Sequence, residues 1–142
     1  MTELVDRIAR AAENAVATCD ARDSGQLDYS EASLAVVEEM LAEAGQWLSE
    51  MTPEQVTTLV QDLGCYVLEV GRREFGGRYQ WHEGRDQPVL VVGEPSFRVA
   101  IITWDKVRGR INGDTGDNIP FFYAGFAGRA RQAVPSTDVL YV

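Results

Sequence analysis

The feature that most constrains this fold is one long segment with a helix start, an apolar period and a helix stop. Thr52-Pro53-Glu54-Gln55 supplies an N-cap threonine, a proline at the first helical position and a glutamine three residues after the cap. Gly76-Gly77 allows the left-handed turn that ends a helix. The segment therefore predicts a helix from Pro53 to about Glu74, roughly 30 Å long. Its apolar face follows the helical period at Val56, Val60, Leu63, Val67 and Val70.

Two glycines, Gly64 and Gly71, lie inside this predicted helix. Each costs about 1 kcal/mol relative to alanine. We therefore expect them to permit close packing, for example against a sheet.

The apolar period changes from about 3.6 to two after this helix. Residues 78–82 alternate like a strand, 88–92 are apolar enough for a central strand, and 97–103 form a third. Short connections predict that these strands form an antiparallel meander. Shorter helices are expected at 104–112 and 120–132, and residues 139–142 can add an edge strand.

Two helices are predicted before the long one, over residues 2–19 and from about residue 30 to 51. Asp28 and Glu31 look like a capping box at the start of the second helix. The loop between these helices is short, so we expect them to pair antiparallel. The second helix carries one apolar stripe, formed by Leu34, Val37, Leu41, Ala44, Leu48 and Met51.

The order of elements predicts an α+β fold in one domain, residues 1–142. An N-terminal three-helix segment, with a long third helix, packs on a three-stranded antiparallel meander and is followed by two short helices. The length of 142 residues is typical of a single domain.

The net charge of −9 is distributed unevenly along the chain. The first 62 residues hold 13 acidic and 3 basic side chains, whereas the remaining residues hold 9 and 10. Such a chain lacks the basic footprint that phosphate contacts require, so we expect no nucleic-acid binding. The acidic half can attract a basic partner or simply keep the protein soluble.

The apolar runs and the cysteine spacing indicate where the protein resides and what its cysteines do. No run approaches the ~20 apolar residues of a membrane helix, and the N-terminus lacks a signal-peptide pattern. We therefore expect a cytoplasmic protein with no membrane partner. Cys19 and Cys65 have no CxxC neighbour, which indicates ordinary thiols rather than a disulfide framework or a zinc site.

Arginines around the end of the long helix begin the candidate binding site. Arg72, Arg73 and Arg78 flank Gly76-Gly77, and arginine binds carboxylate and phosphate in a bidentate way. Cations at a helix C-terminus also complement the helix dipole. Both interpretations stay open from sequence alone.

Trp81 and His82 complete this candidate site at the end of the first strand. The imidazole beside Glu83 can support acid–base chemistry. However, neighbours in a strand point to opposite faces, which favours a surface histidine.

The loop 113–118 contains the candidates for a metal site, Asp114 and Asp117. It lacks the spacing and closing glutamate of an EF-hand, and a turn with a helix N-cap needs the same residue types. We therefore expect no metal. The chain also lacks nucleophilic-serine, P-loop and dinucleotide motifs, so we predict no catalytic residues and no cofactor.

Two further groups lie in the C-terminal third. The aromatic run 121–126 holds more rings than one helix face can bury, and an exposed ring would mark a partner surface. A row of arginines can form a basic surface or pair with the acidic helices; it consists of Arg108, Arg110, Arg129 and Arg131.

The stretch 63–81 resembles a group of small bacterial domains of unknown function. The resemblance covers residues 53–125 and includes the proline before the second strand and the segment 107–113. The family has no assigned activity, so the resemblance implies a fold more than a function. Some small acidic bacterial domains of this kind accompany secreted toxins as immunity proteins. The matching residues are Leu63-Gly64, Tyr66, Glu69, Arg72-Arg73, Gly76-Gly77 and Trp81.

The leading hypothesis is a non-catalytic interaction module that binds a protein partner. An immunity-type inhibitor of a basic toxin is one version. It is motivated by the absent catalytic motifs, the acidic half and the aromatic run. One alternative is a small-molecule-binding protein, or an enzyme, with its site near Arg72–His82. A second is a homodimer built on the apolar stripe of the second helix.

Overall fold

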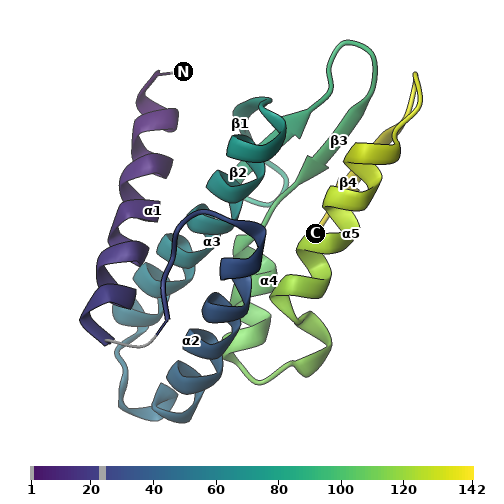
Figure 1. The fold of residues 1–142 in the computed structure, drawn as a ribbon. Coiled ribbons are helices and arrows are strands. Elements are labelled where there is room, and N and C mark those ends of the chain that lie inside the picture. Colours follow the sequence, from purple (N-terminus) through teal and green to yellow (C-terminus); the bar gives the residue numbers. More distant parts are fainter. Residues whose placement is uncertain (1, 23–24) are drawn as a thin grey trace.

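The structure follows the predicted order of three helices, three strands and two helices, with a fourth strand at the end. The computed structural model describes residues 2–22 and 25–142, and in them five α-helices pack with a four-stranded sheet (Figure 1). The fold is therefore α+β. The α-helices are α1 (Thr2–Arg22), α2 (Leu34–Gln46), α3 (Pro53–Phe75), α4 (Trp104–Ile111) and α5 (Ile119–Gln132). The strands are β1 (Arg78–His82), β2 (Gln87–Val92), β3 (Arg98–Ile101) and β4 (Asp138–Tyr141). Single 3-10 turns lie at Glu31–Ser33, Leu48–Glu50 and Thr115–Asp117.

Helix α3 begins and ends close to its predicted bounds, because its end signals are local. The Thr52 hydroxyl accepts a hydrogen bond from the Gln55 N–H, and the Gln55 side chain accepts one from the Thr52 N–H. At the other end Gly76 has a φ of 74° and its N–H donates to the Arg72 carbonyl. Every residue from 63 to 71 is buried, so the second half of α3 runs through the core.

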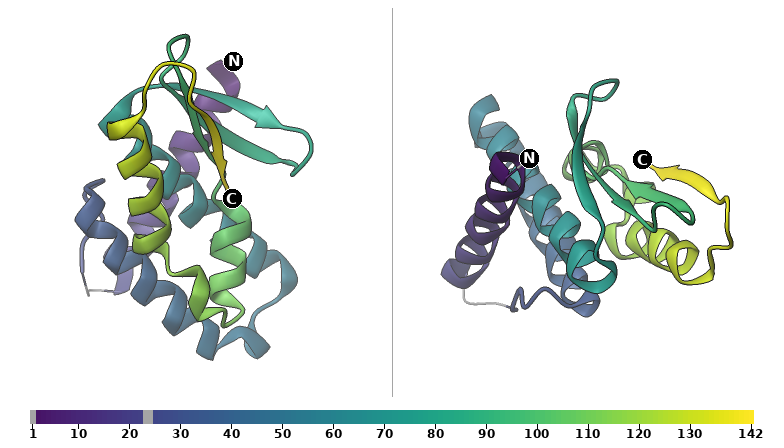
Figure 2. Two further views of the ribbon diagram at one scale, coloured as in Figure 1. Left: turned by 90° about the vertical axis from the view of Figure 1, so that its right-hand side faces the viewer. Right: turned by 90° about the horizontal axis from the view of Figure 1, so that it is seen from above.

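Helix α1 packs along α3, so the predicted pairing of the first two helices is wrong. The two helices run antiparallel, and α4 and α5 lie on the other side of α3 (Figure 1, Figure 2). α2 packs against α4 and α5 instead. The physical reason is that α3 is apolar on several sides, so α1 can pack against it. The single apolar stripe of α2 packs against the C-terminal helices α4 and α5.

Helix α2 is shorter than predicted. Asp28 accepts hydrogen bonds from Ser30 and does not close a box with Glu31. Ser30 caps the 3-10 turn that precedes the helix, and α2 ends at Gln46. The stripe residues Leu34, Val37 and Leu41 are fully buried within this one chain. That face is therefore occupied, which removes the observation behind the homodimer hypothesis.

The sheet contains four strands in the order β1-β2-β3-β4, not three. β1, β2 and β3 form the predicted antiparallel meander, with Tyr79 opposite Leu90 and Val91 opposite Ala100. β4 adds the edge strand, but parallel to β3. A parallel neighbour requires a crossover connection, and α4 and α5 provide it.

The two faces of the sheet contribute to separate apolar clusters. The face toward the helices joins the main core through Tyr79, Leu90, Val92, Val99 and Ile101. The opposite face carries a smaller buried cluster formed by Val89, Val91, Ala100 and Ile102. Alternation along β1 therefore decides which of its side chains can reach the helices.

The two glycines inside α3 permit close packing, as predicted. A Cβ on Gly71 would lie 3.0 Å from the Leu90 side chain of β2. A Cβ on Gly64 would lie 2.5 Å from Cδ1 of Trp104, a distance that no real Cβ contact tolerates. Gly64 therefore creates the space in which the first residue of α4 sits.

Candidate functional site

The residues of the predicted site do not converge on one pocket. Arg72 Nε donates to the Glu69 carboxylate at 2.9 Å, and the Arg73 guanidinium lies 4.0 Å from the same carboxylate. The Arg73 guanidinium also stacks on the Tyr29 ring, 3.5 Å from its centroid. Both arginines thus have partners inside the chain.

Arg78 and His82 lie on the face of the sheet opposite to Trp81, as strand alternation requires. Arg78 donates to the Glu94 carboxylate at 2.6 and 2.9 Å. Nδ1 of His82 accepts from the Arg85 N–H at 3.0 Å and so closes the β1–β2 turn. Of the five predicted site residues, only Trp81 lines the cleft described below.

A buried carboxylate, Glu69, is the residue that organises this region. Only 2% of Glu69 is exposed, and the Tyr79 hydroxyl donates to it at 2.6 Å. Burial, and then the hydrogen bond to the carboxylate, raises the pKa of Tyr79. The first two arginines of the predicted site therefore neutralise a buried acid.

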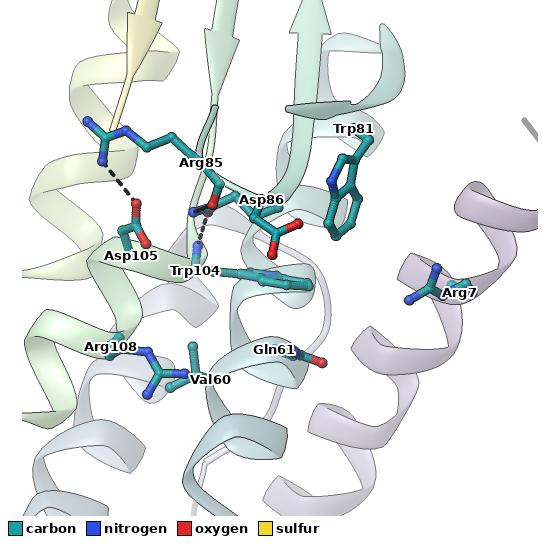
Figure 3. Close-up of a pocket in the computed structure, with 10 residues that line it drawn as sticks. Arg7, Val60, Gln61, Trp81, Arg85, Asp86, Trp104, Asp105 and Arg108 are labelled. Atoms are coloured by element: carbon teal, nitrogen blue, oxygen red, sulfur yellow. Dashed lines mark hydrogen bonds and ion pairs between the residues drawn. The ribbon is translucent and has the colours of Figure 1, made fainter. Parts of the chain in front are cut away.

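A cleft of about 360 Å³ opens between α1, α3, α4 and the β1–β2 turn (Figure 3). We call it the tryptophan cleft. The indoles of Trp81 and Trp104 meet edge to face in it, with ring centroids 6.0 Å apart. Its lining residues are Arg7, Val60, Gln61, Trp81, Arg85, Asp86, Gln87, Trp104, Asp105 and Arg108.

Side chains of Gln87 and Thr103 hydrogen-bond to the backbone around the tryptophan cleft. The Gln87 side chain accepts from the Trp104 N–H at 2.9 Å, which ties the start of α4 to β2. The Thr103 hydroxyl donates to the carbonyl of Gly64 at 2.6 Å. These bonds fix Trp104 against α3 and so set the floor of the cleft.

Five charged side chains line the tryptophan cleft. Arg85 pairs with Asp105 at 3.0 Å. Among the residues that the structure describes, Arg7 and Arg108 form no ion pair. Figure 3 shows Arg7 on α1 across from the indoles and Arg108 beside Val60. The lining thus carries three positive and two negative groups, in a chain that is strongly acidic.

An apolar recess of about 100 Å³ continues from this cleft between α1 and α3. It shares Arg7, Gln61, Trp81 and Trp104 with the cleft and adds Leu4, Ile8, Ala11, Cys65 and Pro88. Burial raises the pKa of Cys65 to about 12. The thiol is therefore protonated at neutral pH and is not a nucleophile there.

A second hollow lies along the first half of α3, and we call it the acidic groove. Its volume is about 660 Å³. The floor is apolar, from Met51 and Leu59, and the carboxylates of Glu54 and Asp62 stand in its lining. Burial raises the pKa of Asp62, although a hydrogen bond from Asn14 opposes the shift. The remaining lining residues are Thr18, Gln55 and Thr58.

The loop 113–118 has a structural role where it is described. The Asp114 side chain accepts from the Gly116 N–H at 3.0 Å and caps a 3-10 turn. The side chain of Asp117 lies outside the described part of the chain. Within the described part, no three His, Cys, Asp or Glu side chains gather closely enough to hold a metal ion.

Two arginines of the predicted row form ion pairs with acidic residues of other elements, and one ring of the aromatic run is exposed. Arg110 of α4 pairs with Glu38 of α2. Arg131 of α5 pairs with Glu74 of α3 and with Glu31 in the 3-10 turn before α2. Phe121 is 79% exposed at the start of α5. The other rings of the run pack inward or lie against Lys106.

Sequence reasoning missed the partners of Trp81 because they come from distant segments. Arg7 lies near the start of α1 and Arg108 in α4, and no local pattern joins them to β1. The one usable signal was Gly64, because a glycine inside a helix indicates that another residue approaches closely.

Comparisons with known proteins assign no family to the chain. No family model, curated protein or solved structure matches it. Across the described ranges 2–22 and 25–142, no helix combines the length and apolar character that crossing a membrane requires. The resemblance of residues 53–125 to small bacterial domains stays a prediction.

Proposed function

We propose that the protein is a non-catalytic interaction module that binds a basic protein partner in the acidic groove. The observation that carries this proposal is the groove lining. It combines an apolar floor with two carboxylates and contains no basic side chain among its described residues. Such a surface suits a segment that presents apolar side chains flanked by lysine or arginine.

Internal ion pairs leave these two carboxylates as available acceptors. Three other acids of the N-terminal half, Glu31, Glu38 and Glu43, already bind arginines of the same chain. Glu54 and Asp62 form no ion pair with any described residue. They therefore keep their charge for an external cation.

The partial burial of Asp62 adds to this preference. Its raised pKa means that removal from water disfavours the charged carboxylate. A lysine or arginine placed beside it would compensate for the lost hydration. Binding of a basic segment should therefore lower the pKa of Asp62 and should weaken with added salt.

An immunity-type inhibitor of a basic toxin is one version of this function. It accords with the acidic half of the chain and with the resemblance of residues 53–125. The proposal itself requires only that the partner be basic and that it use the acidic groove.

The test combines partner capture with a groove variant. The purified protein is immobilised and exposed to a lysate of its own host at low and moderate salt. The double variant Glu54→Gln, Asp62→Asn removes both groove charges. The matched control Asp6→Asn, Glu39→Gln removes one aspartate and one glutamate that line no described groove or cleft.

The expected result is one stoichiometric basic protein, lost at moderate salt. The groove variant should bind it at least about tenfold more weakly, since charge-assisted contacts contribute about 1.5–3 kcal/mol each. The control should bind within about twofold of the unmodified protein. Equal losses in both variants would show that net charge, and not the groove, governs capture.

The exposed Phe121 offers a separate check on where the partner docks. An exposed aromatic is a common anchor in protein interfaces. Phe121→Ala should leave capture unchanged if the acidic groove is the contact. Loss of capture in this variant alone would place the partner on α5 instead.

A further inference from the structure

We infer that the tryptophan cleft binds a small aromatic carboxylate, with the ring in the apolar recess beside Trp81 and Trp104 and the carboxylate on Arg7. This inference concerns a site separate from the acidic groove. It does not depend on the proposed function.

The aromatic part of the ligand follows from the two indoles. Their planes meet at 82° with centroids 6.0 Å apart, so together they offer one ring face and one ring edge. Aromatic rings favour both offset-stacked and edge-to-face arrangements. Trp81 is 38% exposed although it faces the helices, and a planar ligand would cover it.

The position of the ring follows from the apolar recess. Leu4, Ile8, Ala11 and Pro88 line it beside the two indoles. The recess and the cleft share the indoles, so a ring can enter the first while the rest of the ligand stays in the second. The recess has a volume of about 100 Å³ and the cleft one of about 360 Å³, whereas ligand pockets typically hold about 300–1,000 Å³. The ligand is therefore small.

The carboxylate follows from Arg7. Arg7 is exposed, has no ion pair among the described residues, and lines both the recess and the cleft. Among the described residues, it is the one charged side chain that lines the recess. An arginine guanidinium binds a carboxylate through two parallel hydrogen bonds.

A monoanion fits the lining better than a phosphate dianion. Asp86 and Asp105 stand in the same cleft, and Arg85 is already paired with Asp105. Two carboxylates would repel a second negative charge on the ligand.

Phenylacetate is the probe, with two matched comparison compounds. Phenylacetamide keeps the ring and removes the charge, whereas acetate keeps the charge and removes the ring. Binding is followed by the NMR signals of the three indole N–H groups. Trp47 lines neither the recess nor the cleft, so its signal serves as the internal reference.

We expect saturable shifts of the Trp81 and Trp104 signals with phenylacetate in the millimolar range or below. Phenylacetamide and acetate should each bind at least about tenfold more weakly, since a charge-assisted pair or a buried ring is being lost. The Trp47 signal should not move.

Two arginine variants complete the test on the intact chain. Arg7→Gln should weaken phenylacetate binding at least about tenfold. Arg10→Gln removes an exposed arginine of the same helix that lines neither the recess nor the cleft, and it should bind like the unmodified protein. Both residues are exposed, so both variants should fold.

Three results would overturn the inference. The first is that phenylacetate causes no saturable shift of the Trp81 and Trp104 signals. The second is that phenylacetate and phenylacetamide bind equally well. The third is that Arg7→Gln and Arg10→Gln weaken phenylacetate binding equally. Each is independent of the groove variants, so failure here leaves the proposed function standing.

Discussion

The hydroxyl of Tyr79 donates a 2.6 Å hydrogen bond to the buried carboxylate of Glu69. The bond connects β1 to the buried half of α3. A carboxylate in that position requires partners, because an unpaired buried charge is costly. Arg72 supplies the second one.

Tyr79→Phe should therefore destabilise the fold more than the comparable change at Tyr123. Tyr123 donates to Glu74 at 2.8 Å, but Glu74 is 33% exposed, so water can replace the lost donor. We expect the free energy of unfolding to fall by about 1–3 kcal/mol in Tyr79→Phe and by about 1 kcal/mol or less in Tyr123→Phe. Urea unfolding of both variants measures this difference. Equal losses would mean that Glu69 reaches water when Tyr79 is absent.

Stability should fall at alkaline pH. Burial raises the pKa of Cys65 and of the hydroxyls of Tyr66 and Tyr79 in the folded chain. The unfolded chain loses these protons at about pH 8.5 for cysteine and about 10 for tyrosine. Above those values the unfolded state binds fewer protons than the folded state, so the free energy of unfolding decreases as pH rises.

Each such group should contribute a slope of up to about 1.4 kcal/mol per pH unit between its unfolded and its folded pKa. Urea unfolding at a series of pH values gives the total slope. Tyr79→Phe should make that slope shallower above about pH 10, by about one group. An unchanged slope would contradict the raised pKa of Tyr79.

Gly64→Ala should destabilise the protein although alanine favours helix. The added Cβ would lie 2.5 Å from Trp104, so α4 must shift, at an expected net cost of about 1–3 kcal/mol. Gly128→Ala in α5 is the matched control, because nothing lies within 4 Å of the added Cβ. That variant should gain up to about 1 kcal/mol from helix propensity. In thermal unfolding, the melting temperature should fall in Gly64→Ala and rise in Gly128→Ala. Shifts of the same sign in both variants would contradict the packing argument.

Glu38→Ala should loosen the contact of α2 with the C-terminal helices. Glu38 pairs with Arg110, and its other oxygen accepts from the Ile119 N–H at 3.0 Å. Both charged side chains are mostly buried. We therefore expect the free energy of unfolding to fall by about 2–4 kcal/mol. Glu39→Ala changes the adjacent exposed residue and should stay within about 0.5 kcal/mol. Denaturant titration compares the two, and similar losses would mean that the pair contributes nothing specific.

Local features of this fold were predictable from sequence, whereas long-range pairing was not. The ends of α3 follow from Thr52, Gln55 and Gly76, which act on their own neighbours. The partner of α1 and the direction of β4 depend on which apolar surfaces remain free after the other elements have packed. Periodicity shows that a face is apolar but not what covers it.

The candidate site illustrates the same limit. Arg72, Arg78, Trp81 and His82 are close in sequence, yet strand alternation and the buried Glu69 separate them. Trp81 alone was predicted as part of a site and lines the cleft. Its neighbours Arg7 and Trp104 are brought to it by the packing of α1 and by Gly64, and neither effect is visible in the sequence around Trp81.

The parallel pairing of β4 also orders the assembly of the sheet in time. β1, β2 and β3 join through short turns, so their contacts can form early. β4 can dock only after residues 104–137 have closed the crossover, which makes it a late and easily reopened edge. The N–H of Arg98, which donates to the carbonyl of Thr137, should therefore exchange with deuterium sooner than the amides shared by β1 and β2.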